Sequence, residues 1–244
     1  RRMNLFADAL AWIFSPDRLT GSGALPLLFA QQLGYTFLSV AIAALIAVPV
    51  GWAIGHTGKG REVAVAVAGA ARAIPSFGLL ILLVLLMGVL HKPEAAIVTF
   101  VLLAIPSLLA GAYTGFEAID RRVIDAARAV GMTERQILWR VEVPLGFPLL
   151  VAGFRAATLQ VVATVTIAAY IGLGGLGYPI IQGLQLRDYS QILGGAILVA
   201  ALALVLDALL ALAQHAAVPR GVRAGQEQRA ASRPSRSATA PAPA

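Results

Sequence analysis

Five stretches of this sequence are long enough and apolar enough to cross a lipid bilayer, and they restrict the possible folds more than any other feature. A membrane-spanning helix needs about 20 mostly apolar residues. Each stretch is rich in Ala, Gly, Leu and Val, and small residues allow helices to approach closely within lipid. The predicted spans cover residues 33–54, 63–90, 95–116, 148–170 and 190–213. The sequence therefore predicts an all-α membrane protein with five core transmembrane helices.

The composition agrees with this prediction and excludes several other classes of protein. Of the 244 residues, 59% are apolar and 13% are charged, whereas a soluble domain carries about 25% charged residues. The chain contains no cysteine, which excludes disulfides, thiolate metal sites and a cysteine nucleophile. We predict no metal site in this chain.

The net charge of +7 could indicate a nucleic-acid partner, but the basic residues lie in short loops and near the C-terminus rather than on one amphipathic face. We therefore expect no binding to nucleic acid. Cytoplasmic loops of membrane proteins are enriched in Lys and Arg. One side of the predicted bundle holds Lys59, Arg61, Arg121, Arg122, Arg128, Arg135, Arg140, Arg220, Arg223, Arg229, Arg233 and Arg236. The other side holds Arg1, Arg2, Arg18, Lys92 and Arg187. We predict a multi-pass protein of the bacterial cytoplasmic (inner) membrane with its N-terminus outside and its C-terminus in the cytoplasm.

The transmembrane domain is predicted to cover residues 31–215. A short segment lies on each side of it. Residues 1–30 are predicted to form an extracytoplasmic segment, in which 5–14 form a short helix at the membrane interface. Residues 216–244 are rich in Arg, Ala, Ser and Pro. They are predicted to form a disordered cytoplasmic tail, either a solvated end or a tether to anionic lipid.

The second predicted span, 63–90, has two possible structures. It is interrupted by Arg72 and Pro75, and it could form one long tilted helix or two short helices that meet at Pro75. Two complete spans would place the loop with Lys59 and the loop with residues 121–140 on opposite sides of the membrane. The distribution of basic residues favours one span.

The longest polar stretch within the bundle, residues 117–147, is predicted to be an ordered cytoplasmic loop. Asp120 can cap a short helix, and Gly131 can end it in a left-handed conformation. Residues 133–136, Thr-Glu-Arg-Gln, match a capping box that would begin a second short helix, and Pro144 is predicted to stop it. A loop with this much local structure indicates a docking surface rather than a simple connection.

The same loop resembles the EAA motif of ABC importer permeases, which reads E-A-A-x3-G-x9-I-x-L-P. The matching residues are Asp125, Ala126, Ala127, Gly131, Val141, Val143 and Pro144, with Asp in place of Glu and Val in place of both Ile and Leu. The resemblance implies that this loop docks onto an ATPase subunit, that two such subunits bind, and that ATP and Mg²⁺ are bound there rather than by this chain. The alternative is a merely ordered connecting loop.

Most of the chain resembles permeases that import osmoprotectants such as glycine betaine, choline and carnitine. The similar runs are residues 72–80, 144–157 and 168–196; the first of them is shared with methionine importer permeases. The resemblance implies the small type I ABC importer permease fold and pairing with a second copy or a homologous permease. It also implies an extracytoplasmic binding protein that recognises the substrate.

Three other functions remain as alternatives. The first is a permease for methionine or another amino acid. The second is an ion-coupled secondary transporter or channel, which would need acidic residues in the spans, and Asp207 is the only one. The third is an intramembrane hydrolase, but all three histidines, His56, His91 and His215, lie in loops or at a span end.

Gate and hinge candidates come from glycines and prolines. Gly172, Gly174, Gly175 and Gly177 follow the fourth span; they match the dinucleotide fingerprint G-x-G-x-x-G, but without its strand and helix context, so we expect an outer hinge or gate. Pro49, Pro75 and Pro106 are predicted to break their spans, either as hinges beside the path or as simple kinks. The tetrapeptide Ala-Ile-Pro-Ser occurs at 73–76 and again at 104–107, which adds Ser76 to the hinge candidates.

Three ionisable residues lie inside the predicted spans: Arg72, Arg155 and Asp207. Such residues are costly in lipid and are functional candidates by default. Helical rise places Arg155 and Asp207 at similar depths near the cytoplasmic ends of their spans, so we hypothesise that they pair. The alternative is that each arginine extends to the membrane interface.

Overall fold

Helices are the only regular secondary structure in the part of the chain that the structure describes. The computed structural model describes residues 4–21 and 23–218, without the side chain of Arg72. The predicted tail from 219 onward and the environment of Arg72 lie outside this description. The helices are α1 (Leu5–Ile13), η1 (Pro16–Arg18), α2 (Leu25–Thr57), α3 (Arg61–Ala73), α4 (Ser76–Met87), η2 (Val89–His91), α5 (Lys92–Glu117), α6 (Arg121–Ala129), α7 (Glu134–Ile137), the π-helical turn η3 (Leu138–Glu142), α8 (Val143–Ala168), η4 (Ala169–Ile171), α9 (Tyr178–Leu186) and α10 (Tyr189–Ala217).

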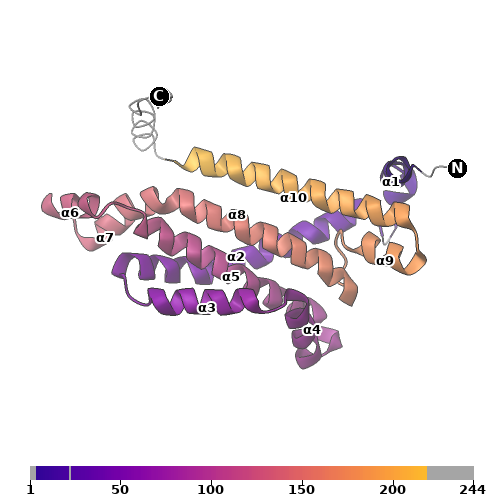
Figure 1. Ribbon diagram of the computed structural model, residues 1–244, viewed down its shortest axis with the longest axis horizontal. Helices are drawn as coiled ribbons and strands as arrows, with labels where there is room; N and C mark the ends of the chain where they lie inside the picture. Colours follow the sequence, from indigo (N-terminus) through magenta and orange to yellow (C-terminus); the bar gives the residue numbers. More distant parts are fainter. Residues whose placement is uncertain (1–3, 22, 219–244) are drawn as a thin grey trace, which may run out of the picture.

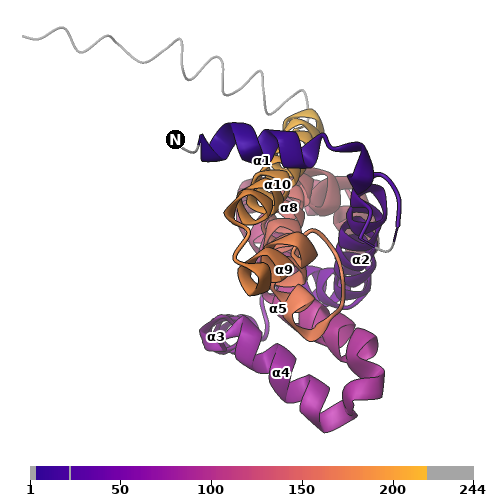
Figure 2. The same cartoon turned by 90° about the vertical axis from the view of Figure 1, so that its right-hand side faces the viewer.

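The long helices α2, α5, α8 and α10 run along one common direction (Figure 1). At one end of this bundle lie α6 and α7, and we call this the loop end. At the other end, the N-terminal end, lie α1 and α9, and α1 crosses the bundle there (Figure 2). The orientation of α1 agrees with the sequence prediction of a short helix that does not span.

Four helical runs within residues 4–21 and 23–218 are long and apolar enough to cross a membrane, and α3 with α4 makes a fifth if the pair is one span. This agrees with the predicted five core helices. The bounds differ from the sequence prediction at several ends. The first spanning helix begins at Leu25 rather than at 33, and the last continues to Ala217 rather than ending at 213.

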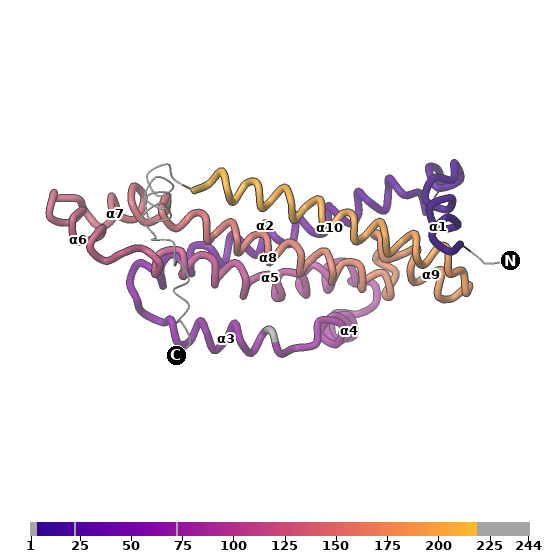
Figure 3. The backbone as a smooth tube through the Cα atoms, turned by 45° about the horizontal axis from the view of Figure 1, so that its top comes forward, coloured from indigo at the N-terminus to yellow at the C-terminus, as the bar shows by residue number. Residues whose placement is uncertain are grey.

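The second predicted span is two helices rather than one. Residues 61–71 and 76–87 are bent by 85° relative to each other. Figure 3 shows α3 beside the bundle and α4 turning away from it. Pro75 explains the break, because proline carries no N–H and disfavours a helical conformation of the residue before it. Ile74 is accordingly extended, with φ −74° and ψ 124°.

Pro49 and Pro106 do not break their helices, so of the two alternatives the one that fits both is a simple kink accommodated by packing. Pro49 lies inside α2 and Pro106 inside α5, and each helix continues through its proline. Neighbouring helices can stabilise a proline within a membrane span. Pro106 is buried in the bundle, which agrees with this explanation.

The segment between α8 and α10 contains a helix that the sequence analysis missed. The glycine-rich residues 172–177 lead into α9, which ends at Leu186. Arg187 then takes a left-handed conformation with φ 56°, and Asp188 caps α10 by accepting from the amides of Ser190 and Gln191. The short length of α9, below that of a span, left no long apolar run to signal it.

Helix α5 is the centre of the bundle. It packs against α2 and α8 along most of its length, and the main buried cluster draws residues from α2, α3, α4, α5 and α8. Glycines make these contacts close: a methyl group on Gly111 would lie 2.8 Å from Cα of Gly153, and one on Gly115 would lie 2.6 Å from the carbonyl oxygen of Gly146. Such small-residue contacts replace the hydrophobic effect as the reason for helix association in lipid.

We expect Gly115→Ala to destabilise the bundle, because the added methyl group meets backbone atoms of α8 that cannot rotate away. Overpacking of this kind costs about 1–3 kcal/mol. The measurement is the thermal unfolding midpoint of the purified protein in detergent. Gly34→Ala is the matched control, since no atom lies within 4 Å of the position of its methyl group. Equal midpoints for the two variants would contradict the close α5–α8 contact.

Candidate functional site: the coupling loop

The loop between α5 and α8 folds as two short helices joined by a glycine elbow, as the sequence predicts. The Asp120 carboxylate accepts from the backbone N–H of Arg122 at 2.9 Å and so caps α6. Gly131 has φ 83° and ends the turn after α6, in a conformation that residues with a side chain rarely adopt. The N–H of Met132 donates to the carbonyl of Ala127 across this elbow at 3.1 Å.

The capping box of α7 is present, but Pro144 does not stop the helix that follows. The Thr133 hydroxyl accepts from the N–H of Gln136, whose side chain accepts from the N–H of Thr133. From Glu134 the chain continues through the π-helical turn into α8, with Pro144 in the first turn of α8. Pro144 cannot donate to the preceding turn, and the π-helical turn at Leu138–Glu142, directly before it, is where the regular α-helical bonding pattern is interrupted. Loop and span are therefore one continuous helical run, which corrects the sequence prediction.

The loop has a small core of its own. Ile124, Ala127 and Ile137 are buried together, with Met132 and Val141 packed against them. An ion pair adds to this core on the outside.

The Arg128 guanidinium joins α6 to α7, because its Nε donates to Glu134 Oε1 at 2.8 Å and its Nη2 donates to Oε2 at 3.2 Å. This hydrogen bond lowers the pKa of the Glu134 carboxyl and raises that of Arg128. The two helices are thus held together by an apolar core and a bidentate ion pair.

The motif residues divide between the inside and the outside of the loop. Asp125, Ala126, Gly131 and Pro144 are exposed, whereas Val141 and Val143 are half-buried. Ala127 is buried in the core of the loop, so this motif residue offers little surface to a partner. Its small side chain serves the packing of α6 on α7 instead.

The exposed apolar surface of the loop lies on residues that the motif does not include. Val130 is 79% exposed and Val123 is 42% exposed, although both belong to the α6 segment. Exposed valines beside Asp125 and Ala126 form a surface suited to docking. The sequence analysis missed Val123 and Val130 because neither is a residue of the EAA motif. Helical periodicity relative to Ile124 would have placed both outside the core of the loop.

A buried acidic side chain fastens the loop to α2. Glu142 is 6% exposed and its Oε2 lies 2.5 Å from Nδ1 of His56, at the end of α2. The Nε2 of the same histidine lies 3.7 Å from Oε2 of Glu134. One imidazole therefore contacts both α7 and the π-helical turn. No sequence spacing could have signalled this contact, because 86 residues separate its partners.

Aromatic and ionic contacts connect further elements in the same region. Trp52 of α2 stacks on Phe116 of α5, with ring centroids 6.2 Å apart, and its ring meets the edge of Trp139 in the π-helical turn at 5.7 Å. Nearby, Arg61 Nε lies 2.8 Å from Glu117 Oε1 and links the start of α3 to the end of α5. A displacement of the loop would therefore be passed to α2 and α5 as well as to α8.

Within the spans, Arg155 of α8 pairs with Asp207 of α10, as the sequence hypothesis states. The Arg155 Nε donates to Asp207 Oδ1 at 2.5 Å and Nη2 donates to Oδ2 at 2.7 Å. A bidentate pair satisfies both charges within a segment where an unpaired charge is costly.

The glycine-rich gate candidates form a turn that is fastened to α2. Gly172, Gly174 and Gly175 have φ of 76°, 89° and 74°. The N–H of Gly175 donates to the Gln31 side chain at 3.0 Å, and the N–H of Leu176 donates to that of Gln32 at 3.1 Å. The amide of the buried Gln32 also donates to the Val162 carbonyl of α8 at 2.9 Å. Gly177 leaves no room for a side chain beside Thr166.

The sequence and the fold of this chain are similar to those of known proteins. Residues 39–223 match the family described as binding-protein-dependent transport system inner membrane component. The chain belongs to this family.

Similar curated permeases carry osmoprotectant names. The OpuCB permease of the glycine betaine/carnitine/choline transport system of Bacillus subtilis (strain 168) is 30% identical, over 85% of this chain and 95% of that protein. The choline permease OpuBB of the same strain is 31% identical, over 84% and 93%. The osmoprotectant import permease OsmW of Salmonella typhimurium is 33% identical, over 84% and 97%.

Solved structures show the same fold. An inward-facing structure of the MetNI methionine ABC transporter matches with a TM-score of 0.70 and 24% identity, over 82% of this chain and 100% of that one. An amino-acid ABC transporter crystallised with histidines matches with a TM-score of 0.63 and 18% identity, over 77% and 91%. The predicted type I ABC importer permease fold is thereby confirmed.

For the contact between loop and span we expect His56→Ala to destabilise the permease by about 1–3 kcal/mol, because it leaves the buried Glu142 carboxylate without its partner. Removing both partners, His56→Ala with Glu142→Leu, should recover much of the loss. The measurement is thermal unfolding of the purified permease in detergent, arranged as a double-mutant cycle. Strictly additive losses would show that the two side chains are not coupled.

For the pair within the spans we expect Arg155→Gln and Asp207→Asn each to lower the amount of folded permease in the membrane. Each leaves one charge in the span without its counterion. The double variant should lose much less than the sum of the two. Membrane-inserted protein is quantified by detergent extraction and size-exclusion chromatography, and additive losses would argue against the coupling of the pair.

Proposed function

We propose that this chain is the membrane-spanning permease subunit of an ATP-driven ABC importer for a small quaternary-amine osmoprotectant, of the kind represented by glycine betaine, choline and carnitine. The observation that carries the substrate class is the set of curated relatives at 30% identity or more, named for these solutes and matched over most of both chains. The chain is a transport component and does not itself hydrolyse ATP.

Two ATPase subunits dock on the loop end of the assembly, one on each permease, and hold the ATP and Mg²⁺. The fastened loop supports this proposal: its own core, the Arg128–Glu134 pair and the His56–Glu142 contact make it stiff enough to transmit a push. The exposed Val123 and Val130 offer the apolar surface that a partner would cover.

A second copy or a homologous permease completes the transport path, and a separate extracytoplasmic binding protein delivers the solute. The family description names a binding-protein-dependent system, which supports the separate binding protein. Helix α10 supports the second permease, because only 6% of its most apolar stretch is buried within one copy. Its surface is left for lipid or for another subunit.

The loop end faces the cytoplasm and the N-terminal end faces outward. The charge distribution supports this orientation, since Lys59 and Arg61 between α2 and α3 lie at the same end as the five arginines of residues 121–140. The glycine-rich turn after α8 then lies at the outer end, where its bonds to Gln31 and Gln32 make it a closure of the outer side. We assign the hinge to the break at Pro75 between α3 and α4. Pro106 is not a hinge in this proposal, because α5 continues through it.

A permease for methionine or another amino acid is the nearest alternative. Its support is structural likeness below 25% identity, which concerns the fold alone. The sequence relatives favour the osmoprotectant class over this alternative.

The test is uptake by proteoliposomes that contain the permease, its ATPase and its binding protein. We expect uptake of labelled glycine betaine or choline that requires all three proteins and ATP. Val130→Asp should weaken ATPase binding roughly tenfold, about the effect of losing one buried side chain at an interface, and uptake should fall with it. Val63→Asp is the control, because Val63 is also an exposed valine, at the start of α3 outside the loop.

Three results would overturn the proposal. Uptake by the permease without ATP would indicate a secondary transporter or channel. Uptake of methionine in place of quaternary amines would indicate the other importer class. Unchanged ATPase binding by Val130→Asp would place the docking surface elsewhere.

A further inference from the structure

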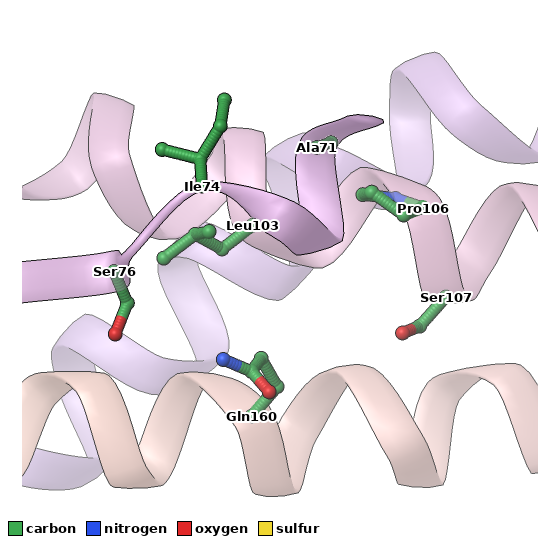
Figure 4. Close-up of a pocket in the computed structure, with 7 residues that line it drawn as sticks. All are labelled: Ala71, Ile74, Ser76, Leu103, Pro106, Ser107 and Gln160. Atoms are coloured by element: carbon green, nitrogen blue, oxygen red, sulfur yellow. The ribbon is translucent and has the colours of Figure 1, made fainter. Parts of the chain in front are cut away.

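A cavity of about 460 Å³ lies beside the break between α3 and α4 (Figure 4). Its wall comes from three parts of the chain that are distant in sequence. Ala71, Ile74 and Ser76 line it from the break, Pro106 and Ser107 from α5, and Gln160 from α8. We call it the α3–α5–α8 chamber. A volume of this size is within the range of small-ligand sites.

The polar side chains of the chamber converge, and among the described residues they have no hydrogen-bond partner. Figure 4 shows the hydroxyls of Ser76 and Ser107 and the amide of Gln160 directed toward one space. None of the three side chains makes a hydrogen bond to another residue within the described part of the chain. Gln160 lies well inside the span α8 and is exposed in a single copy. Polar groups at this depth require a polar partner, since lipid offers none.

The break supplies a further acceptor. In a continuous helix the carbonyl of Ala71 would accept from the amide of residue 75, but residue 75 is proline and has no N–H. Ala71 lines the chamber. The break therefore leaves the carbonyl of a lining residue without its helical donor, and broken helices commonly line binding sites within membranes.

The two copies of the repeated tetrapeptide both line this chamber. Ala-Ile-Pro-Ser occurs at 73–76 and at 104–107, and each copy contributes lining residues to the same chamber: Ile74 and Ser76 from the first, Pro106 and Ser107 from the second. One proline breaks its helix and the other does not. What the two copies share is a serine that follows proline and faces the chamber.

We propose that this chamber binds the transported solute on its way through the membrane, as a weak site for a small quaternary amine with a carboxylate or hydroxyl group. This inference rests on the proposed function. The Gln160 amide and the serine hydroxyls donate to the carboxylate or hydroxyl oxygen of the solute. The hydroxyl, carboxamide and Ala71 carbonyl oxygens face its methylated ammonium.

The chemistry of the wall sets the strength of this site. The lining residues that the structure describes carry no ionised side chain, so what they offer the solute is dipoles alone. Weak binding suits a site along a path, because the solute must leave again. Discrimination among solutes then comes from the separate binding protein, and the chamber excludes only those that need a counter-charge.

The absence of cysteine in the chain allows a direct test with a single introduced thiol. In the permease–ATPase complex in proteoliposomes, Ser107→Cys should react with a water-soluble thiol reagent. Glycine betaine or choline should slow this reaction, and a concentration of twice the Kd would slow it about threefold, because one third of the sites would be free.

Two further substitutions, each combined with Ser107→Cys, make the test specific. Gln160→Leu keeps the size of the side chain and removes its amide, and we expect it to abolish protection by the solute. Thr164→Val is the matched control: it removes a hydroxyl one turn along α8 that is bonded to the carbonyl of Gln160 within its own helix. Protection should persist in this variant.

The outcomes separate the chamber from the proposed function. Uptake of glycine betaine by the complete transporter, together with no protection of Ser107→Cys, would overturn the chamber and leave the importer standing. A thiol at residue 107 that does not react, or protection that survives Gln160→Leu, would do the same. Failure of the complete transporter to take up any quaternary amine would overturn the proposed function and this inference with it.

Discussion

The close contact of α5 with α2 and α8 is the constraint on which the rest of the molecule depends. In lipid, helices gain little from burying apolar surface, so they associate through close packing of small residues and through internal polar contacts. Gly111 and Gly115 face Gly153 and Gly146 so closely that no side chain fits between them. This contact fixes the ends of α5 and α8, and the coupling loop connects those two ends. The loop can be rigid because the helices at both of its ends are already held in place.

Helix α8 connects the loop, the chamber and the glycine-rich turn. Its start continues the loop through the π-helical turn, which holds Glu142 against His56. Further along, Arg155 binds α10, Gln160 faces the chamber, and the Val162 carbonyl accepts from Gln32, whose side chain also holds the glycine-rich turn. A tilt of this one helix would therefore change the loop, the chamber and the outer turn together.

Sequence patterns predict the parts of this structure that depend on local chemistry. Apolar runs gave four of the spans, the Asp120 and Thr133 caps came from neighbouring residues, and helical rise alone indicated the Arg155–Asp207 pair. Contacts between distant residues left no such signal. The His56–Glu142 contact, the burial of Ala127 and the convergence of the two Ala-Ile-Pro-Ser copies all depend on how the helices pack. The prolines show the same limit: Pro75 breaks a helix and Pro106 does not, because packing decides whether a kinked helix is retained.

The continuity from α7 into α8 has a consequence for how a push at the loop would travel. A proline that ended the second loop helix would have left a flexible joint between the docking surface and the span. Pro144 instead follows the π-helical turn directly, and the helical run continues past it from Glu134 to Ile171. The one irregularity is the π-helical turn at 138–142, and it is the turn that Trp139 and Glu142 fasten to α2. The site where this run could flex is thus fastened to α2, so we expect a force on the loop to act on α8 and α2 together.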